Sequence, residues 1–99
     1  MSKPILKALG WVPHQPRTGW YDTSPYADND HPMWMVSPKN IEAMDRVPMI
    51  NIPLVLASAS FDKNDELRGT SHLGGGTYSR QFWNAVAVPY LSMRMQLGI

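Results

Sequence analysis

The residues that could carry out catalysis gather in one short region, where Asp62, Ser71 and His72 precede a run of glycines. A serine, a histidine and a carboxylate are the groups of a nucleophilic hydrolase, provided that folding brings them within hydrogen-bonding reach. A nucleophile elbow needs Gly-x-Ser-x-Gly, and the stretch from Gly69 to Leu73 lacks the second glycine. We therefore expect no enzyme. These three side chains are retained only as the site of an alternative, a small-ligand-binding domain or enzyme.

The glycine run from Gly74 to Gly76 resembles part of a phosphate-binding loop. Such a loop continues with Lys and then Ser or Thr. Here Thr77, Tyr78 and Ser79 follow, so the lysine that would reach the phosphate is missing. We interpret the glycines as a hinge or as a place where another backbone approaches closely, and we expect no cofactor.

The stretch that begins at Asp28 starts like a calcium-binding loop. Such a loop needs Gly at its sixth position and Glu at its twelfth, where this chain has Met33 and Lys39. The same count from Asp62 fails at the same two positions. The histidines have no His or Cys partner at the spacing of a zinc site, although folding could still gather them: they are His14, His31 and His72. The sequence therefore predicts no metal site.

The composition limits the class of protein. The chain has 99 residues and no cysteine, and its 9 Lys and Arg nearly balance its 8 Asp and Glu, for a formal net charge of +1. Only 17% of the residues are charged, against about 25% in an ordinary soluble domain. Balanced charge makes nucleic acid an unlikely partner, because a dedicated nucleic-acid-binding protein has a basic surface. A small fold without disulfides can gain stability by docking on other subunits.

The sequence predicts no membrane span, because no window approaches about 18 consecutive apolar residues. The apolar stretch near the N-terminus is interrupted by Lys7 and Gly10 and stops at Pro13, unlike that of a signal peptide. We expect a soluble protein made in the cytoplasm.

Residues 11–36 combine recurrent prolines with large aromatic side chains. Prolines at this frequency are incompatible with a helix or a central strand, whereas a disordered linker is normally poor in aromatic residues. We interpret the region as an extended arm that lies ordered on a neighbour; the alternative is a long loop over the domain's own core. A short helix over residues 3–9 precedes it, with Ser2 as its cap, Pro4 in its first turn and Gly10 just past its end.

Residues 38–46 show the clearest helical pattern. Pro38 suits the first turn, and Glu42 and Arg46 are spaced to form an ion pair. Ile41 and Met44 share the face that we expect to point inward.

The rest of the compact part, residues 37–99, is expected to be richer in strands. The apolar runs at 49–58 and 82–97 favour strands, because β-branched and alternating apolar residues are typical of them. The second run also fits a helical stripe, so both alternatives stay open there. A polar turn or hairpin tip lies at 61–69. The sequence therefore predicts one small domain, 1–99, of the α+β class and β-rich, with two short helices, a few strands and a long irregular N-terminal arm.

Large aromatic and methionine side chains in the charge-poor regions are the expected contacts with partners, because exposed apolar patches mark interaction sites. Arginines without nearby acids in the last third of the chain fit the same use. The expected interface residues are Trp11, Trp20, Tyr21, Tyr26, Met33, Trp34, Met35, Arg80, Trp83 and Arg94.

These features predict a structural subunit that binds other protein subunits of a large assembly. A virus or phage particle is the favoured host, with the chain as a minor capsid, cement or connector protein in the virion. On this interpretation tryptophans fill pockets of the partners, and the predicted strands add to neighbouring sheets. An accessory subunit of another large intracellular complex is the alternative within the same class.

Overall fold

The backbone is mainly helical in the computed structural model, which describes residues 2–13, 21–23, 36, 38–68, 73 and 78–99. The helices, in chain order, are α1 (Ser2–Ala8), α2 (Pro38–Arg46), the 3-10 helix η1 (Met49–Asn51), α3 (Ile52–Ser58), α4 (Arg80–Phe82), the π-helix η2 (Trp83–Ala87) and α5 (Val88–Leu97). The strands form two antiparallel pairs, β1 (Val12–Pro13) with β2 (Tyr21–Thr23) and β3 (Ser60–Phe61) with β4 (Leu67–Arg68). The fold is a small unit of mixed helix and strand, and the prediction that it is β-rich is wrong.

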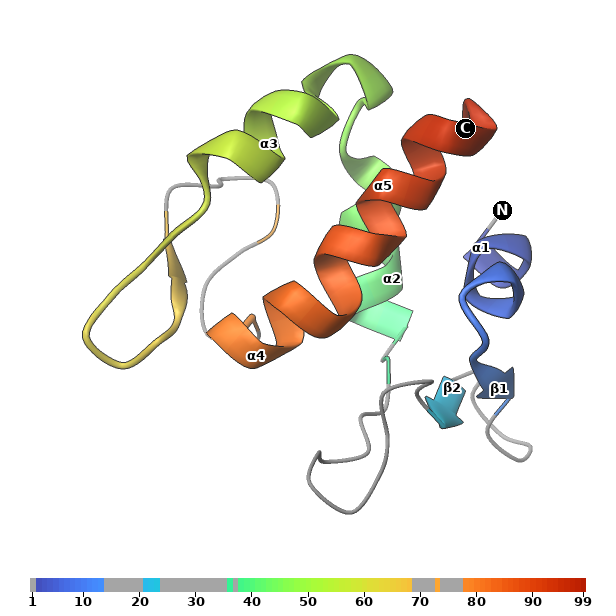
Figure 1. Ribbon diagram of the computed structural model, residues 1–99, viewed down its shortest axis with the longest axis horizontal. Helices are drawn as coiled ribbons and strands as arrows, with labels where there is room; N and C mark the ends of the chain where they lie inside the picture. Colours follow the sequence, from blue (N-terminus) through green and yellow to red (C-terminus); the bar gives the residue numbers. More distant parts are fainter. Residues whose placement is uncertain (1, 14–20, 24–35, 37, 69–72, 74–77) are drawn as a thin grey trace.

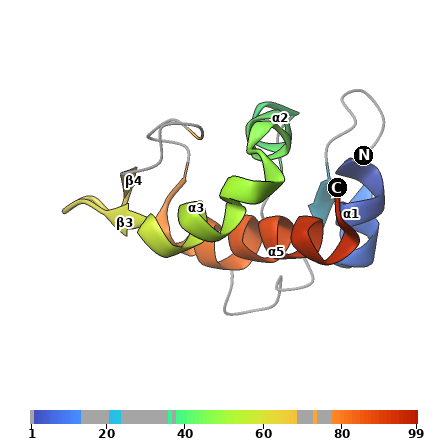
Figure 2. The same ribbon diagram turned by 90° about the horizontal axis from the view of Figure 1, so that it is seen from above.

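The helices are arranged around one long helical rod. α4, η2 and α5 follow one another without a break and form this central rod, residues 80–97 (Figure 1). α1 packs on one side of α5 and α3 on the other. α2 lies behind α5 in Figure 1, and the view from above shows it on one side of the row formed by α3, α5 and α1 (Figure 2). The central rod, which contains the last helix of the chain, therefore packs against the first helix, α1.

The predicted N-terminal helix is confirmed as α1. Its end has the bonds of a Schellman motif: the Gly10 N–H donates to the Lys7 carbonyl and the Trp11 N–H to the Leu6 carbonyl, each at 3.0 Å. Gly10 has a φ of 90°, in the left-handed range where a side chain is strained. The motif turns the chain so that Leu6 and Trp11 are both buried.

The predicted helix over residues 38–46 is confirmed as α2. Ile41 and Met44 are buried, as the helical spacing predicts. Glu42 and Arg46 form an exposed ion pair one turn apart. α2 therefore has an apolar inner face and a charged outer face, which is the usual pattern of a helix at a protein surface.

The strand predicted over 49–58 is wrong, because this segment forms η1 and α3. Pro53 lies in the first turn of α3, where the missing N–H has no helical partner to lose. Ile52 and Val55 are buried and lie three residues apart, which is the spacing of a helix face. A short apolar run does not separate a strand from a helix by periodicity alone.

The strand preferred over 82–97 is also wrong, and the helical alternative is the observed structure. Burial recurs with helical spacing along the central rod, at Phe82, Trp83, Val86, Ala87, Tyr90, Leu91 and Arg94. In the π turn, the Val88 N–H donates to the carbonyl of Trp83, five residues earlier. The turn lies directly before Pro89, whose ring would meet the carbonyl of Ala85 in a regular α-helix. The wider turn therefore lets the helix continue past the proline.

The hairpin predicted around residues 61–69 is confirmed by the pairing of β3 with β4. A further bridge joins Glu66 to Ser79, and the Leu67 N–H donates to the Tyr78 carbonyl at 2.9 Å. The side-chain oxygen of Ser79, Oγ, accepts a hydrogen bond from the backbone N–H of Phe82 and so caps the start of the central rod. The hairpin is thus fixed to the start of the rod.

Most of the predicted arm, 11–36, lies outside the described residues. Within it, β1 and β2 pair with each other, and Val12 lies opposite Thr23. Trp11 and Val36, at the two ends of the arm, are buried in the core of this chain. Both ends of the arm are therefore anchored on the same domain.

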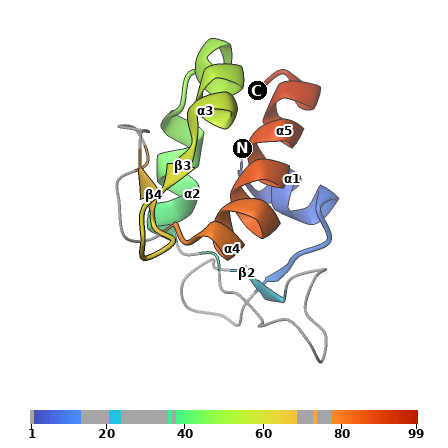
Figure 3. The ribbon, with the colours of Figure 1, turned by 60° about the vertical axis from the view of Figure 1, so that its left-hand side comes forward.

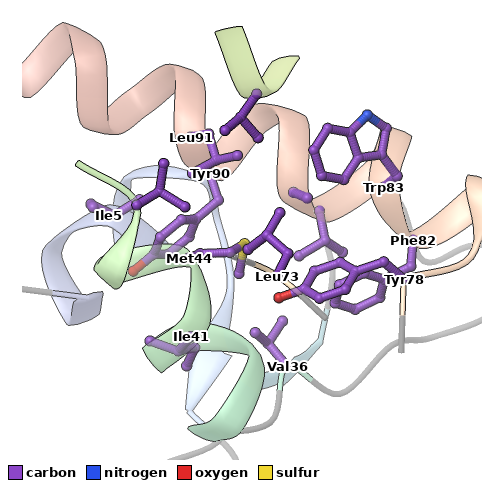
Figure 4. Packing of buried hydrophobic residues seen from close by; sticks show 14 of the residues in the cluster. Ile5, Val36, Ile41, Met44, Leu73, Tyr78, Phe82, Trp83, Tyr90 and Leu91 are labelled. Atoms are coloured by element: carbon purple, nitrogen blue, oxygen red, sulfur yellow. The ribbon is translucent and has the colours of Figure 1, made fainter. Parts of the chain in front are cut away.

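The core lies between the central rod, α1 and α2 (Figure 4). The ring of Tyr78 packs edge-to-face against Phe82 and Trp83, with centroid distances of 5.5 and 6.4 Å. Its hydroxyl donates to the Asn40 carbonyl at 3.3 Å. Burial raises the pKa of Tyr78 to about 12, because the ionised phenol would lose its hydration.

Candidate interaction surface

The structure describes only part of the predicted interface. Tyr21 lies in β2. The remaining residues expected from the arm lie outside the described residues: Trp20, Tyr26, Met33, Trp34 and Met35. Ser71 and all three histidines also lie outside them. Of the alternative ligand or catalytic site, only Asp62 is described.

Three predicted interface residues are buried in the chain's own interior. Trp11 and Trp83 are each 4% exposed and belong to the hydrophobic core. Arg94 is 7% exposed. A small domain needs its largest side chains to form a core, and these two tryptophans serve the core of this fold.

Arg94 joins the end of the central rod to the end of α2. One terminal nitrogen, Nη1, donates to the carbonyls of Met44 at 2.8 Å and Val47 at 2.6 Å. Nε donates to the Ile99 carbonyl at 2.9 Å. Carbonyls at the end of a helix have no partner within the helix, so the guanidinium caps α2 and fixes the direction in which the chain leaves it toward η1.

A cavity of about 170 Å³ lies beside this anchor and is lined by Ile5, Asp45, Arg94 and Ile99. Its charged groups already serve the fold. The Tyr90 hydroxyl donates to Oδ1 of Asp45 at 2.6 Å, and Arg94 holds the three carbonyls described above. The polar groups at this position therefore connect α2 with α5, and we assign them a role in stability.

Arg80, another predicted interface residue, is exposed, and its side chain contacts other residues of this chain. Its Nε lies 3.1 Å from Oδ1 of Asp65, and its guanidinium lies 4.7 Å from the ring centroid of Phe61. Its backbone N–H donates to the Asp65 carbonyl at 2.9 Å. Arg80 therefore holds the hairpin against the start of the central rod.

Asp62 organises the turn of the hairpin. Its Oδ1 accepts the backbone N–H groups of Asn64 at 2.8 Å and Glu66 at 3.1 Å, and its Oδ2 lies 2.8 Å from a nitrogen of Arg68. The hydrogen bond from Glu66 is the main reason why the pKa of Asp62 is lower than its usual 3.8, and Asn64 and Arg68 lower it further. These are the bonds of a structural turn. The described residues contain no cluster of three or more His, Cys, Asp or Glu that could hold a metal ion.

Sequence reasoning missed the exposed large apolar side chains of one helical segment. They lie on the outer side of η1 and α3, and we call this side the end surface. Ile50 is 86% exposed and Leu54 68%. Among the residues that the structure describes, the large hydrophobic side chains that are exposed are Met49, Ile50, Leu54, Met95 and Leu97.

The end surface lies at the end of the molecule where α5 also ends. α3 and α5 pack against each other and run in opposite directions, so the start of α3 lies beside the end of α5 (Figure 3). Ile52 and Val55 hold α3 in place, because they are buried on its inner side. Ile50 and Leu54, one turn apart, then point outward as an apolar stripe.

A signal for this surface is present in the sequence. From Val47 to Phe61 there is no charged residue, although a helix of this region must have an outer face. A helix that is apolar on all sides is normally buried. A strand was predicted here, and a strand buried on both faces is also apolar throughout. The lack of charge therefore did not indicate an exposed face.

Comparisons of this chain with protein-family models, with curated proteins and with solved structures find no match. Among the described residues, every helix is too short or too polar to cross a bilayer.

Proposed function

We propose that this protein is a structural subunit that binds other protein subunits of a large assembly, and that the end surface is one of its contacts. The observation that carries the proposal is the apolar outer face of η1 and α3, where Ile50 and Leu54 are exposed without a charged neighbour along the helix. Large apolar patches of this kind mark protein–protein contacts.

A virus or phage particle is the host that we propose, with the chain as a minor capsid, cement or connector protein. The support for this host is compositional: a short chain without cysteine, with 17% charged residues, 9 prolines and 4 tryptophans. Trp11 and Trp83 have no part in this contact. The proposal gives that role to the end surface and to the aromatic residues of the arm.

The role as a ligand-binding domain or enzyme that uses Asp62, Ser71 and His72 receives no support from the hairpin. Asp62 is engaged by two backbone N–H groups and by Arg68. A carboxylate with these partners is held in its ionised form. It is therefore suited to closing a turn and poorly suited to accepting a proton near neutral pH.

The proposal is tested on the isolated full-length protein by sedimentation velocity and by calorimetry. We expect self-association, aggregation or a broad, weakly cooperative unfolding transition, because a subunit with an uncovered apolar surface lacks part of its stabilising contacts. A monodisperse monomer that unfolds in one cooperative transition would contradict the proposed function.

A further inference from the structure

We propose that the cavity between α1, α2 and the end of α5 binds a small zwitterion, a free amino acid with an aliphatic side chain. The cavity of about 170 Å³ is lined by Ile5, Asp45, Arg94 and Ile99. It lies where α1 packs against α5, and the end of α5 is beside α1 (Figure 2). This binding goes beyond the proposed function and does not depend on the end surface. Its basis is a pair of opposite charges that line one cavity without forming an ion pair.

The first observation concerns the guanidinium of Arg94, whose side chain is 7% exposed. Its Nε and Nη1 donate to the three backbone carbonyls described above. Its Nη2 makes no hydrogen bond to any residue that the structure describes. Buried polar groups are normally paired, and a buried donor without an acceptor costs free energy. An acceptor in the adjoining cavity therefore gives Nη2 a partner.

The second observation is that Asp45 keeps one carboxylate oxygen available. Its Oδ1 accepts the Tyr90 hydroxyl, whereas its Oδ2 has no hydrogen bond or ion pair with the described part of the chain. Asp45 lies in the last turn of α2, where the helix dipole disfavours a negative side chain and favours a cation. A positively charged donor is therefore stabilised beside Oδ2.

The third observation is that the two charged side chains of the cavity form no ion pair with each other. A ligand that matches both charges needs one negative and one positive group. The carboxylate of an amino acid accepts from Nη2 of Arg94, and its ammonium group donates to Oδ2 of Asp45. A ligand with a single charge leaves one of these two side chains without a partner.

The size and the walls of the cavity limit the rest of the ligand. Pockets for drug-sized ligands have volumes of about 300–1,000 Å³, so a cavity of about 170 Å³ admits only a small molecule. Ile5 and Ile99 supply an apolar wall that suits an aliphatic side chain. Asp45 and Ile99 are partly exposed, which gives the ligand access from solvent.

The test is isothermal titration calorimetry of the full-length protein with L-valine and with two analogues that each lack one charge. Isovalerate lacks the ammonium group, and isobutylamine lacks the carboxylate. We expect L-valine to bind with a dissociation constant of about 1 mM, as suits so small a ligand. We expect each analogue to bind more than about tenfold more weakly, because one charged side chain then stays unpaired. Glycine, which has no aliphatic side chain, should also bind more weakly than L-valine.

Asp45→Asn and a control, Asp65→Asn, locate the site. Each substitution removes one negative charge, but Asp65 lies in the exposed hairpin between β3 and β4 and pairs with Arg80. Asparagine keeps an oxygen that can accept the Tyr90 hydroxyl. We expect Asp45→Asn to weaken the binding of L-valine more than about tenfold and to abolish its advantage over isovalerate. Asp65→Asn should bind L-valine like the wild type, and circular dichroism checks that both variants are folded.

Three results would overturn the inference. In the first, L-valine shows no saturable binding to the wild type, which leaves the cavity to water. In the second, isovalerate or isobutylamine binds as tightly as L-valine, which means that only one of the two charges is used. In the third, Asp45→Asn binds L-valine like the wild type, which moves the site elsewhere. The proposed function stands or falls separately, because it is decided by the self-association and the unfolding of the protein without ligand.

Discussion

α2 and α3 are short helices that follow each other in the chain, and their outer faces differ in polarity. Each has a proline in its first turn, and each buries one side against the rest of the domain. The outer face of α2 presents the ion pair of Glu42 and Arg46, whereas that of η1 and α3 presents Ile50 and Leu54. Both helices are too short to persist without packing. The two helices differ in the surroundings that stabilise their outer faces. The charged face of α2 is stable in water, whereas the apolar face of α3 is stabilised by contact with another apolar surface.

The largest loss of stability should come from a substitution of Arg94, which holds the chain between these two helices. Arg94→Met keeps much of the side-chain volume but leaves the carbonyls of Met44 and Val47 without their donor. We expect a loss of about 3–5 kcal/mol in the free energy of unfolding, because buried hydrogen bonds to a charged group are lost together. Urea denaturation followed by circular dichroism measures it.

Arg94→Lys is the control for charge. Lysine keeps the positive charge but has no fork to reach two carbonyls and Ile99 at once. If Arg94→Lys were as stable as the wild type, the shape of the guanidinium would have no part in holding the chain there.

Two isoleucines of the same segment give a matched test of the inner and outer faces. Ile52 is 0% exposed and Ile50 is 86% exposed. Ile52→Ala should lower the free energy of unfolding by about 2–4 kcal/mol, because it leaves a cavity in the core. Ile50→Ala should change the stability of the monomer by less than about 0.5 kcal/mol. Equal losses in chemical denaturation would mean that α3 is covered equally on both sides within the monomer.

The hydrogen bond between Tyr90 and Asp45 gives a smaller effect on the inner face of α2. Tyr90→Phe removes the hydroxyl that donates to Oδ1 of Asp45 at 2.6 Å and keeps the buried ring. The expected loss is about 1–2 kcal/mol in the free energy of unfolding. Thermal unfolding with an unchanged oligomeric state checks it, and a change in self-association without a loss of stability would place this pair in the contact.

The smallest effect is expected at Asp62, in the charged hairpin that follows α3. Its pKa lies below the usual 3.8 in the folded chain, mainly because of the hydrogen bond from the Glu66 N–H. A depressed carboxyl pKa stabilises the fold above the unfolded value, and this stabilisation disappears as the pH falls below 3.8 through the folded value. NMR titration of the Asp62 carboxyl carbon measures the pKa directly. In Asp62→Asn, this part of the acid dependence of stability should be missing, and a titration at the ordinary value would contradict the turn described above.

The sequence predicted α1, α2 and the hairpin because their signals are local. Gly10 ends α1 because its backbone adopts a positive φ. Glu42 and Arg46, spaced as an ion pair, indicate the solvent-exposed face of α2. The helix at 49–58 was missed because its apolar residues are nearly continuous, and at 82–97 the strand was preferred over the helical alternative because apolar and polar residues alternate there. Tertiary packing decides between helix and strand in both segments.

The predicted contact residues remain a prediction, although three of them are buried within the chain. Aromatic side chains attract attention as contact points, yet Trp11 and Trp83 are needed for the core of so small a domain. Arg94 lacks a nearby acid in the sequence because its partners are backbone carbonyls, which no sequence pattern marks. The surface that remains exposed is formed by aliphatic residues of a segment that had been assigned to a strand.

The most direct measurement of the central claim uses the absence of cysteine from the chain, which makes any introduced thiol unique. The reactivity of Leu54→Cys toward a thiol reagent is measured over a range of protein concentrations, with Lys63→Cys in the exposed hairpin as the control. We predict that the thiol at position 54 becomes protected as the concentration rises, while the thiol at position 63 reacts at a constant rate. Equal and concentration-independent rates at both positions would contradict it.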